Sequence, residues 1–148
     1  MAMKEQIQAD MRTALKAGEK GRLSALRMLL AAVQSREIEK RAELDDTEVL
    51  QVIEKLIKQR KDSARQFADA GRADREQQEL GEADILKAYL PEQLSAAELE
   101  ALVAEVIAAT GSASIKDMGK VMGELRNRAQ GKADMGALSA LVKSKLAG

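Results

Sequence analysis

An all-helical fold is the class that this sequence predicts, from its composition and its hydrophobic periodicity. Alanine and leucine, two of the strongest helix formers, supply 26 and 18 of the 148 residues. The aromatic residues are Phe67 and Tyr89 alone, and β-branched residues are sparse, which argues against a sandwich or a barrel. Apolar side chains recur every three or four residues, as they do on one face of a helix. We therefore expect helices joined by short turns.

The first two expected helices are separated by glycines. Gly18 ends the first helix, and the second begins after Gly21, because glycine is a common stop signal for a helix. Each helix has an apolar stripe that we expect to be buried. The stripes are Ile7, Met11, Ala14 and Leu15 in the first, and Leu23, Leu26, Leu29, Leu30 and Val33 in the second.

The third and fourth helices follow a turn at residues 45–47. Asp46 or Thr47 is expected to cap the third helix, since a short polar side chain at this position accepts from free backbone N–H groups. Gly71 separates the third helix from a fourth over about residues 74–89. The apolar stripes are Val49, Ile53, Leu56, Ile57, Ala64 and Phe67, then Leu80, Ala83, Leu86 and Leu90.

Pro91 is the only proline, and it marks the expected domain boundary. Residues before a proline avoid the helical backbone conformation, so the fourth helix should stop near Tyr89. Ser95 and Glu98 then form a capping-box pattern that opens the next helix. The sequence predicts an N-terminal helical hairpin or bundle domain over residues 1–91 and a compact three-helix domain over residues 92–148.

The three helices of the second domain have clear sequence boundaries. Gly111 closes the fifth helix, and Ser114 is expected to cap the sixth. Gly131 ends the sixth, and Asp134 caps the seventh. Their apolar positions are Leu99, Leu102, Val103, Val106 and Ile107, then Met118, Met122, Leu125 and Ala129, then Leu138, Leu141, Val142 and Leu146.

Arg60 interrupts the apolar stripe of the third helix, where a charged group must reach solvent or pair with a carboxylate. In a hairpin that turns at Gly71, Arg60 lies opposite the acid-rich fourth helix, whose stripe is interrupted by Glu76 and Glu79. We expect an Arg–Glu network that joins these two helices. A cluster of catalytic carboxylates is the weaker alternative, because neither a nucleophile nor a metal-ligand set accompanies it.

Several chemistries have no residues to perform them in this sequence. It contains no cysteine and no histidine, which excludes thiolate, zinc-cluster and Ser-His-Asp arrangements. It has neither a GxxxxGK[ST] nor a GxGxxG nucleotide-binding motif. We identify no catalytic residue and expect neither a metal nor a cofactor. We also expect no signal peptide and no membrane-spanning segment, which makes the cytoplasm the default location.

Charge is unevenly distributed although Lys+Arg and Asp+Glu are equal at 24 each. Residues 92–115 contain four acidic and no basic residues, for a net charge of −4. Residues 116–148 contain seven basic and three acidic residues, for a net charge of +4. A basic segment of this kind is a modest indication of an anionic partner.

The sixth helix combines lysines with two internal glycines. Lys116 and Lys120 lie opposite its apolar face, and Gly119 and Gly123 flank them. Each internal glycine costs a helix about 1 kcal/mol relative to alanine, so an explanation is needed. Close packing against another helix is the first explanation that we expect. The alternative is close approach of a ligand, for which a glycine-edged pair of lysines suits a phosphate chain.

The corner between the sixth and seventh helices also has two interpretations. Gly131 and Lys132 precede the first free N–H groups of the seventh helix, which can bind an anion such as phosphate. Asp134 is placed to accept from the same N–H groups as the helix cap. We therefore expect a structural turn first and an anion site second.

Several segments together resemble the YqeY family. They are Arg60-Lys61-Asp62-Ser63 through Phe67, Ala70-Gly71-Arg72, Ala88-Tyr89-Leu90-Pro91-Glu92-Gln93-Leu94-Ser95 through Glu98-Leu99, Lys116 through Gly123, and Gly131-Lys132-Ala133-Asp134. The resemblance covers essentially the whole chain. Residues 92–148 also resemble the tail of the B subunit of the glutamine-dependent aminoacyl-tRNA amidotransferase.

The resemblance implies a non-catalytic helical module related to tRNA-dependent amidation, whose tail binds tRNA or a tRNA–enzyme complex. The residues expected to contact nucleic acid are Lys116, Lys120 and Lys132, with Gly119, Gly123 and Gly131 allowing close approach. One alternative is an adaptor that docks on an amidotransferase or another protein associated with aminoacyl-tRNA. Another is a carbon–nitrogen ligase with glutamine as amido-N donor, which only the family association implies.

Overall fold

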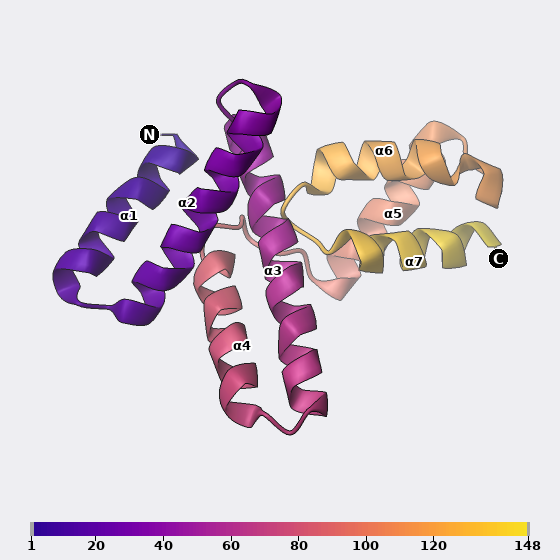
Figure 1. The fold of residues 1–148 in the computed structure, drawn as a ribbon. Coiled ribbons are helices and arrows are strands. Elements are labelled where there is room, and N and C mark those ends of the chain that lie inside the picture. The colour runs from indigo at the N-terminus through magenta and orange to yellow at the C-terminus, as the bar shows by residue number, and fades with distance from the viewer. Residues whose placement is uncertain (1, 148) are drawn as a thin grey trace. The chain divides into compact units, whose positions relative to one another are not determined.

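A computed structural model describes residues 2–147 of the chain and confirms the all-α fold class. In this part of the chain it contains seven α-helices and one short 3₁₀ turn. The helices gather into two compact units, Met1–Leu90 and Pro91–Gly148, which we call the N-terminal and C-terminal units. Figure 1 shows the helices of each unit in chain order.

The N-terminal unit contains α1 (Met3–Ala17), α2 (Lys20–Lys40), α3 (Asp46–Asp69) and α4 (Ala73–Lys87). The apolar stripes expected from the sequence form most of its core. The buried members of this core are Ile7, Leu26, Leu29, Leu30, Val33, Leu44, Val49, Ile53, Leu56, Ile57, Ala83 and Leu86. Leu15 departs from the expected stripe, because its side chain is 56% exposed.

Two helix starts differ from those that we predicted. α2 begins at Lys20, so Gly21 is a helical residue and not a boundary. α3 is capped by Asp45, whose carboxylate accepts from the Glu48 backbone N–H at 2.9 Å, so the prediction of Asp46 or Thr47 was wrong. Asp45 has the extended backbone that a cap requires, whereas Asp46 is already helical and accepts from the Met3 backbone N–H.

Tyr89, two residues after the end of α4, forms a hydrogen bond with a residue of α1. Its Oη donates a hydrogen bond to Oδ2 of Asp10 at 2.5 Å. Burial and the Asp10 carboxylate both raise the pKa of the Tyr89 phenol, so the hydroxyl remains a donor at neutral pH. This bond holds the last residues before Pro91 in place.

The C-terminal unit contains α5 (Ala96–Thr110), the 3₁₀ turn η1 (Ile115–Asp117), α6 (Met118–Ala129) and α7 (Met135–Ala147). Ser95 and Glu98 form the expected capping box, and Gly111 ends α5 with a left-handed backbone. Ser114 was predicted to cap the sixth helix, but it caps the 3₁₀ turn η1, and Asp117 immediately precedes α6. The buried core consists of Val103, Val106, Val121, Met122, Leu125, Ala129, Ala133, Leu138, Val142 and Leu146.

Within residues 2–147, no helix combines the length and the apolar character needed to cross a membrane.

Candidate functional site

The surface of α6 that faces away from its core presents lysines beside exposed backbone. Val121, Leu125 and Ala129 are fully buried on the inner face of the helix. Lys116 in η1 and Lys120 in the first turns of α6 are exposed. Gly119 and Gly123 are exposed as well. We call Lys116, Gly119, Lys120 and Gly123 the lysine–glycine strip.

The two glycines of this strip do not pack against another helix, so the explanation that we placed first was wrong. A Cβ atom added at Gly119 or Gly123 would meet no atom of a neighbouring element within 4 Å in the part of the chain that the structure describes. Neither glycine has the positive φ that excludes other residues. Neither packing nor backbone conformation therefore requires glycine at these positions, and both leave the helix backbone accessible.

An acidic neighbour limits the positive charge of the strip. The carboxylate of Asp117 accepts hydrogen bonds from the backbone N–H groups of Ala113 and Ser114, at 2.9 and 3.3 Å. These two bonds, together with the nearby Lys120 ammonium, lower the pKa of Asp117. Asp117 is therefore ionised at neutral pH and offsets part of the charge of Lys120.

Gly131 and Lys132 lie at the opposite end of α6 from Lys116. The 12 residues of α6 rise about 18 Å at 1.5 Å per residue. Gly131 is buried and has a φ of +75°, which explains a glycine there through the turn alone. The structure thus brings Lys116 and Lys120 together with Gly119 and Gly123 but keeps exposed Lys132 apart from them.

Hydrogen bonds from the start of the C-terminal unit hold the turn that carries Lys132. Gln93 Nε2 donates to the Gly131 carbonyl at 2.6 Å, and the Leu94 N–H donates to the Lys132 carbonyl at 2.9 Å. Sequence reasoning missed the role of Gln93, because its partner is 38 residues away. The Asp134 carboxylate accepts from the Gly136 and Ala137 N–H groups, as expected for a helix cap.

Arg60 forms the expected network between α3 and α4. Its Nη1 lies 3.2 Å from Oε2 of Glu79 and 3.7 Å from Oε2 of Glu82. Glu79 was predicted, whereas the second carboxylate is Glu82 and not Glu76. Glu82 lies one helical turn from Glu79 toward the core, so both carboxylates face Arg60. Arg60 Nε and Glu79 Oε2 are buried without a hydrogen-bond partner.

The network predicts a pH-dependent effect of Glu82. Burial, and secondarily the Glu79 charge, raise the pKa of Glu82 despite the opposing effect of Arg60. Ionised Glu82 therefore lowers stability, by an amount that is absent below the unfolded-state pKa and complete above the higher folded-state pKa. We expect Glu82→Gln to raise the urea midpoint at pH 7, the gain to shrink as the pH falls toward about 4.5, and little of it to remain below that pH.

The matched control for this prediction is Glu79→Gln, which removes the carboxylate nearest to Arg60. We expect this variant to lower the midpoint at pH 7, because it weakens the shorter ion pair. A lower midpoint for Glu82→Gln at pH 7, by the same amount as at pH 4, would contradict the assignment.

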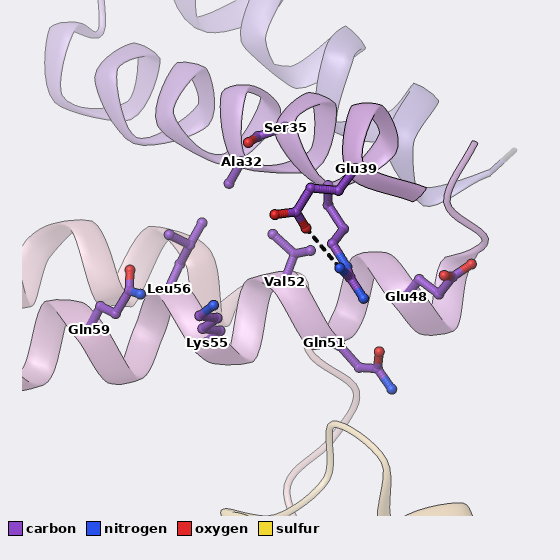
Figure 2. Close-up of a pocket in the computed structure, with 10 residues that line it drawn as sticks. Ala32, Ser35, Glu39, Glu48, Gln51, Val52, Lys55, Leu56 and Gln59 are labelled. Carbon is purple, nitrogen blue, oxygen red and sulfur yellow. Dashed lines mark hydrogen bonds and ion pairs between the residues drawn. The ribbon is translucent and has the colours of Figure 1, made fainter. Parts of the chain in front are cut away.

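A groove of about 550 Å³ lies between α2 and α3. Figure 2 shows Ala32, Val52 and Leu56 between the helices. Arg36, which also lines the groove, forms an ion pair with Glu39 at 2.9 Å. Polar side chains from both helices line the rest, namely Ser35, Glu48, Gln51, Lys55 and Gln59. The sequence did not predict this groove, because it depends on how two helices pack.

The last kind of candidate site to consider among the described residues is a cluster of metal ligands. In residues 2–147, no group of three or more carboxylates is placed to hold a metal ion. The features that remain are exposed cations, accessible backbone and an internal Arg–Glu network. Together they define a class: an all-helical protein of two compact units.

This chain belongs to the YqeY family. The family model, described as Yqey-like protein, matches residues 4–146. Relatives include "Altered inheritance of mitochondria protein 41, mitochondrial" of Saccharomyces cerevisiae, 33% identical over 95 residues. The protein of the same name in Lachancea thermotolerans is 32% identical over 104 residues.

These relatives are longer than the chain. The matched segments cover 64% and 68% of this chain, and 51% and 56% of the yeast and Lachancea relatives. The chain thus spans about half the length of the curated relatives it matches. The cytoplasmic location and the resemblance of residues 92–148 to the amidotransferase tail stay predictions.

Proposed function

We propose that this protein is a non-catalytic helical module whose C-terminal unit binds tRNA, alone or in complex with an enzyme. The observation that carries the proposal is the lysine–glycine strip, in which two exposed lysines lie beside two exposed glycines that no other described helix packs against. The resemblance of residues 92–148 to the amidotransferase tail supports tRNA as the partner. tRNA is present in the cytoplasm and also in mitochondria, the location printed in the names of the yeast relatives.

The chemistry of the strip favours contacts with phosphate and ribose. Lys116 and Lys120 donate to phosphate oxygens, and the missing side chains at Gly119 and Gly123 let a sugar–phosphate chain approach the helix. Sequence-specific RNA recognition relies on aromatic side chains that stack on bases. The C-terminal unit contains none, since Phe67 and Tyr89 both precede it. We therefore expect the unit to recognise RNA shape and not base sequence.

The test is a fluorescence-anisotropy titration of labelled tRNA at two salt concentrations. We expect saturable binding, with a log–log salt slope of roughly −2 to −4 if about three or four phosphates are neutralised. Lys116→Gln with Lys120→Gln is expected to weaken binding and to reduce the slope by about 2. The matched control is Lys143→Gln with Lys145→Gln, which removes the same charge from exposed positions of α7.

Two results would overturn the proposal. One is the absence of saturable binding at low salt. The other is an equal loss of affinity in both lysine pairs, because only the total charge would then matter.

A protein-interaction adaptor is the second candidate, and exposed Ile115 favours it. Its side chain is 44% exposed beside Lys116, and apolar side chains anchor protein interfaces more often than RNA contacts. Affinity capture after nuclease treatment separates the two candidates. Retention of a specific amidotransferase subunit, lost in Ile115→Ser, would favour the adaptor.

A further inference from the structure

The segment from Arg60 to Arg72 carries part of the family resemblance, yet it lies outside the C-terminal unit. It forms the far half of the hairpin between α3 and α4, which projects away from α1 and α2 in Figure 1. We call residues 58–80 the α3–α4 arm. Its only buried apolar residue is Ala64. The arm therefore contributes little to the core of its unit, and its surface residues need another explanation.

Ion pairs join the two helices on the inner face of the arm. Arg60 contacts Glu79 and Glu82 across the hairpin, and all three side chains are less than a quarter exposed. Arg60 is therefore a positioning residue that holds α3 against α4. At 100° per residue, Lys58, Lys61 and Arg65 lie about 100–160° around α3 from Arg60.

The outer face of the arm carries a row of free cations. Lys58, Lys61 and Arg65 are exposed, and at 100° per residue they lie within about 60° of one another around α3. None of the three forms an ion pair within residues 2–147. Asp62 and Asp69 lie four residues after Lys58 and Arg65, the less favourable order for a helical ion pair.

The surroundings of these cations favour a phosphate backbone over a protein or a membrane. Protein interfaces and membrane-bound helices both use large apolar side chains beside the charged ones. The exposed large hydrophobic residues of the described chain are Leu15, Ile38 and Ile115, and none belongs to the arm. Phosphate contacts require only cations and polar donors, which is what this face offers.

We propose that Lys58, Lys61 and Arg65 form a second contact surface for the RNA sugar–phosphate backbone. The inference rests on the proposed function, because the partner is the same tRNA. From Lys58 to Arg65 the helix rises about 10 Å, enough to follow several phosphates of one strand. Arg65 adds a guanidinium that binds phosphate with two parallel hydrogen bonds.

The experiment compares two triple variants of the full chain in the labelled-tRNA titration. Lys58→Gln, Lys61→Gln and Arg65→Gln remove the three cations of the arm. Lys16→Gln, Lys20→Gln and Arg27→Gln remove three exposed cations from α1 and α2, which form no ion pair in the described part of the chain. Circular dichroism checks that both variants remain helical.

We expect the arm variant to weaken binding at least about tenfold at low salt and to reduce the log–log salt slope by about 2. The control is expected to change affinity less than about twofold. Unchanged affinity of the arm variant, or an equal loss in the control, would overturn the inference. In either case binding that depends on Lys116 and Lys120 would leave the proposed function standing, whereas absence of binding by the unaltered chain would remove both.

Discussion

Replacing Leu125 with alanine is expected to lower the free energy of unfolding of the C-terminal unit by about 2–5 kcal/mol. The Leu125 side chain is fully buried in α6, within the core formed with α5 and α7. Its truncation removes buried apolar surface and leaves a cavity that the surrounding helices fill only in part. A unit of about 60 residues has little stability to lose, so this change should unfold a large fraction of it at 37 °C.

Urea denaturation followed by far-UV circular dichroism measures this effect. The matched control is Leu15→Ala, the same chemical change in α1 at a side chain that is 56% exposed. We expect the control to change stability by less than about 0.5 kcal/mol. A loss below about 1 kcal/mol for Leu125→Ala would show that α6 does not pack as described.

Replacing Gly119 and Gly123 together with alanine is expected to stabilise the C-terminal unit by about 1.5–2 kcal/mol, since each internal glycine costs a helix about 0.8–1.0 kcal/mol. A Cβ atom at either position meets no neighbouring element within 4 Å, so no steric cost offsets the gain. The same methyl groups would obstruct a sugar–phosphate chain on the helix. We therefore expect tRNA affinity to fall while the midpoint of unfolding rises.

The control for the glycine pair is Gly111→Ala at the end of α5. Gly111 has a φ of +66°, so alanine there is strained and should destabilise the unit by about 1 kcal/mol. A loss of stability in the Gly119 and Gly123 double variant would restore the helix-packing explanation. Stabilisation with unchanged tRNA affinity would mean that the glycines serve no RNA contact.

Local signals in the sequence predicted the features that depend on neighbouring residues. Gly18, Gly111 and the Ser95 capping box were predicted because a left-handed end or a cap needs only a few residues. Arg60 and Glu79 were predicted because a hairpin with one turn fixes which positions of its two helices face each other. Where two aspartates compete for one cap, composition does not choose between them, and Asp45 was missed.

Features that depend on packing between distant segments were not predictable in this way. The groove between α2 and α3 exists because of the shapes of two facing surfaces. The exposure of the backbone at Gly119 and Gly123 depends on where the other helices pack. The hydrophobic periodicity of α6 does not contain that information. The sequence therefore identified Gly119 and Gly123 as candidate RNA-binding positions, but only the structure showed that they are exposed.

The hydrogen bonds of Gln93 and Leu94 determine where the chain can be cut. Together they tie the residues just after Pro91 to the turn at Gly131, 38 positions downstream of Gln93. An excised fragment that starts at Ser95 would keep all of α5, α6 and α7 yet leave the Gly131 and Lys132 carbonyls without these donors. A shortened version intended for crystallisation or spectroscopy must therefore begin at Gln93 or earlier.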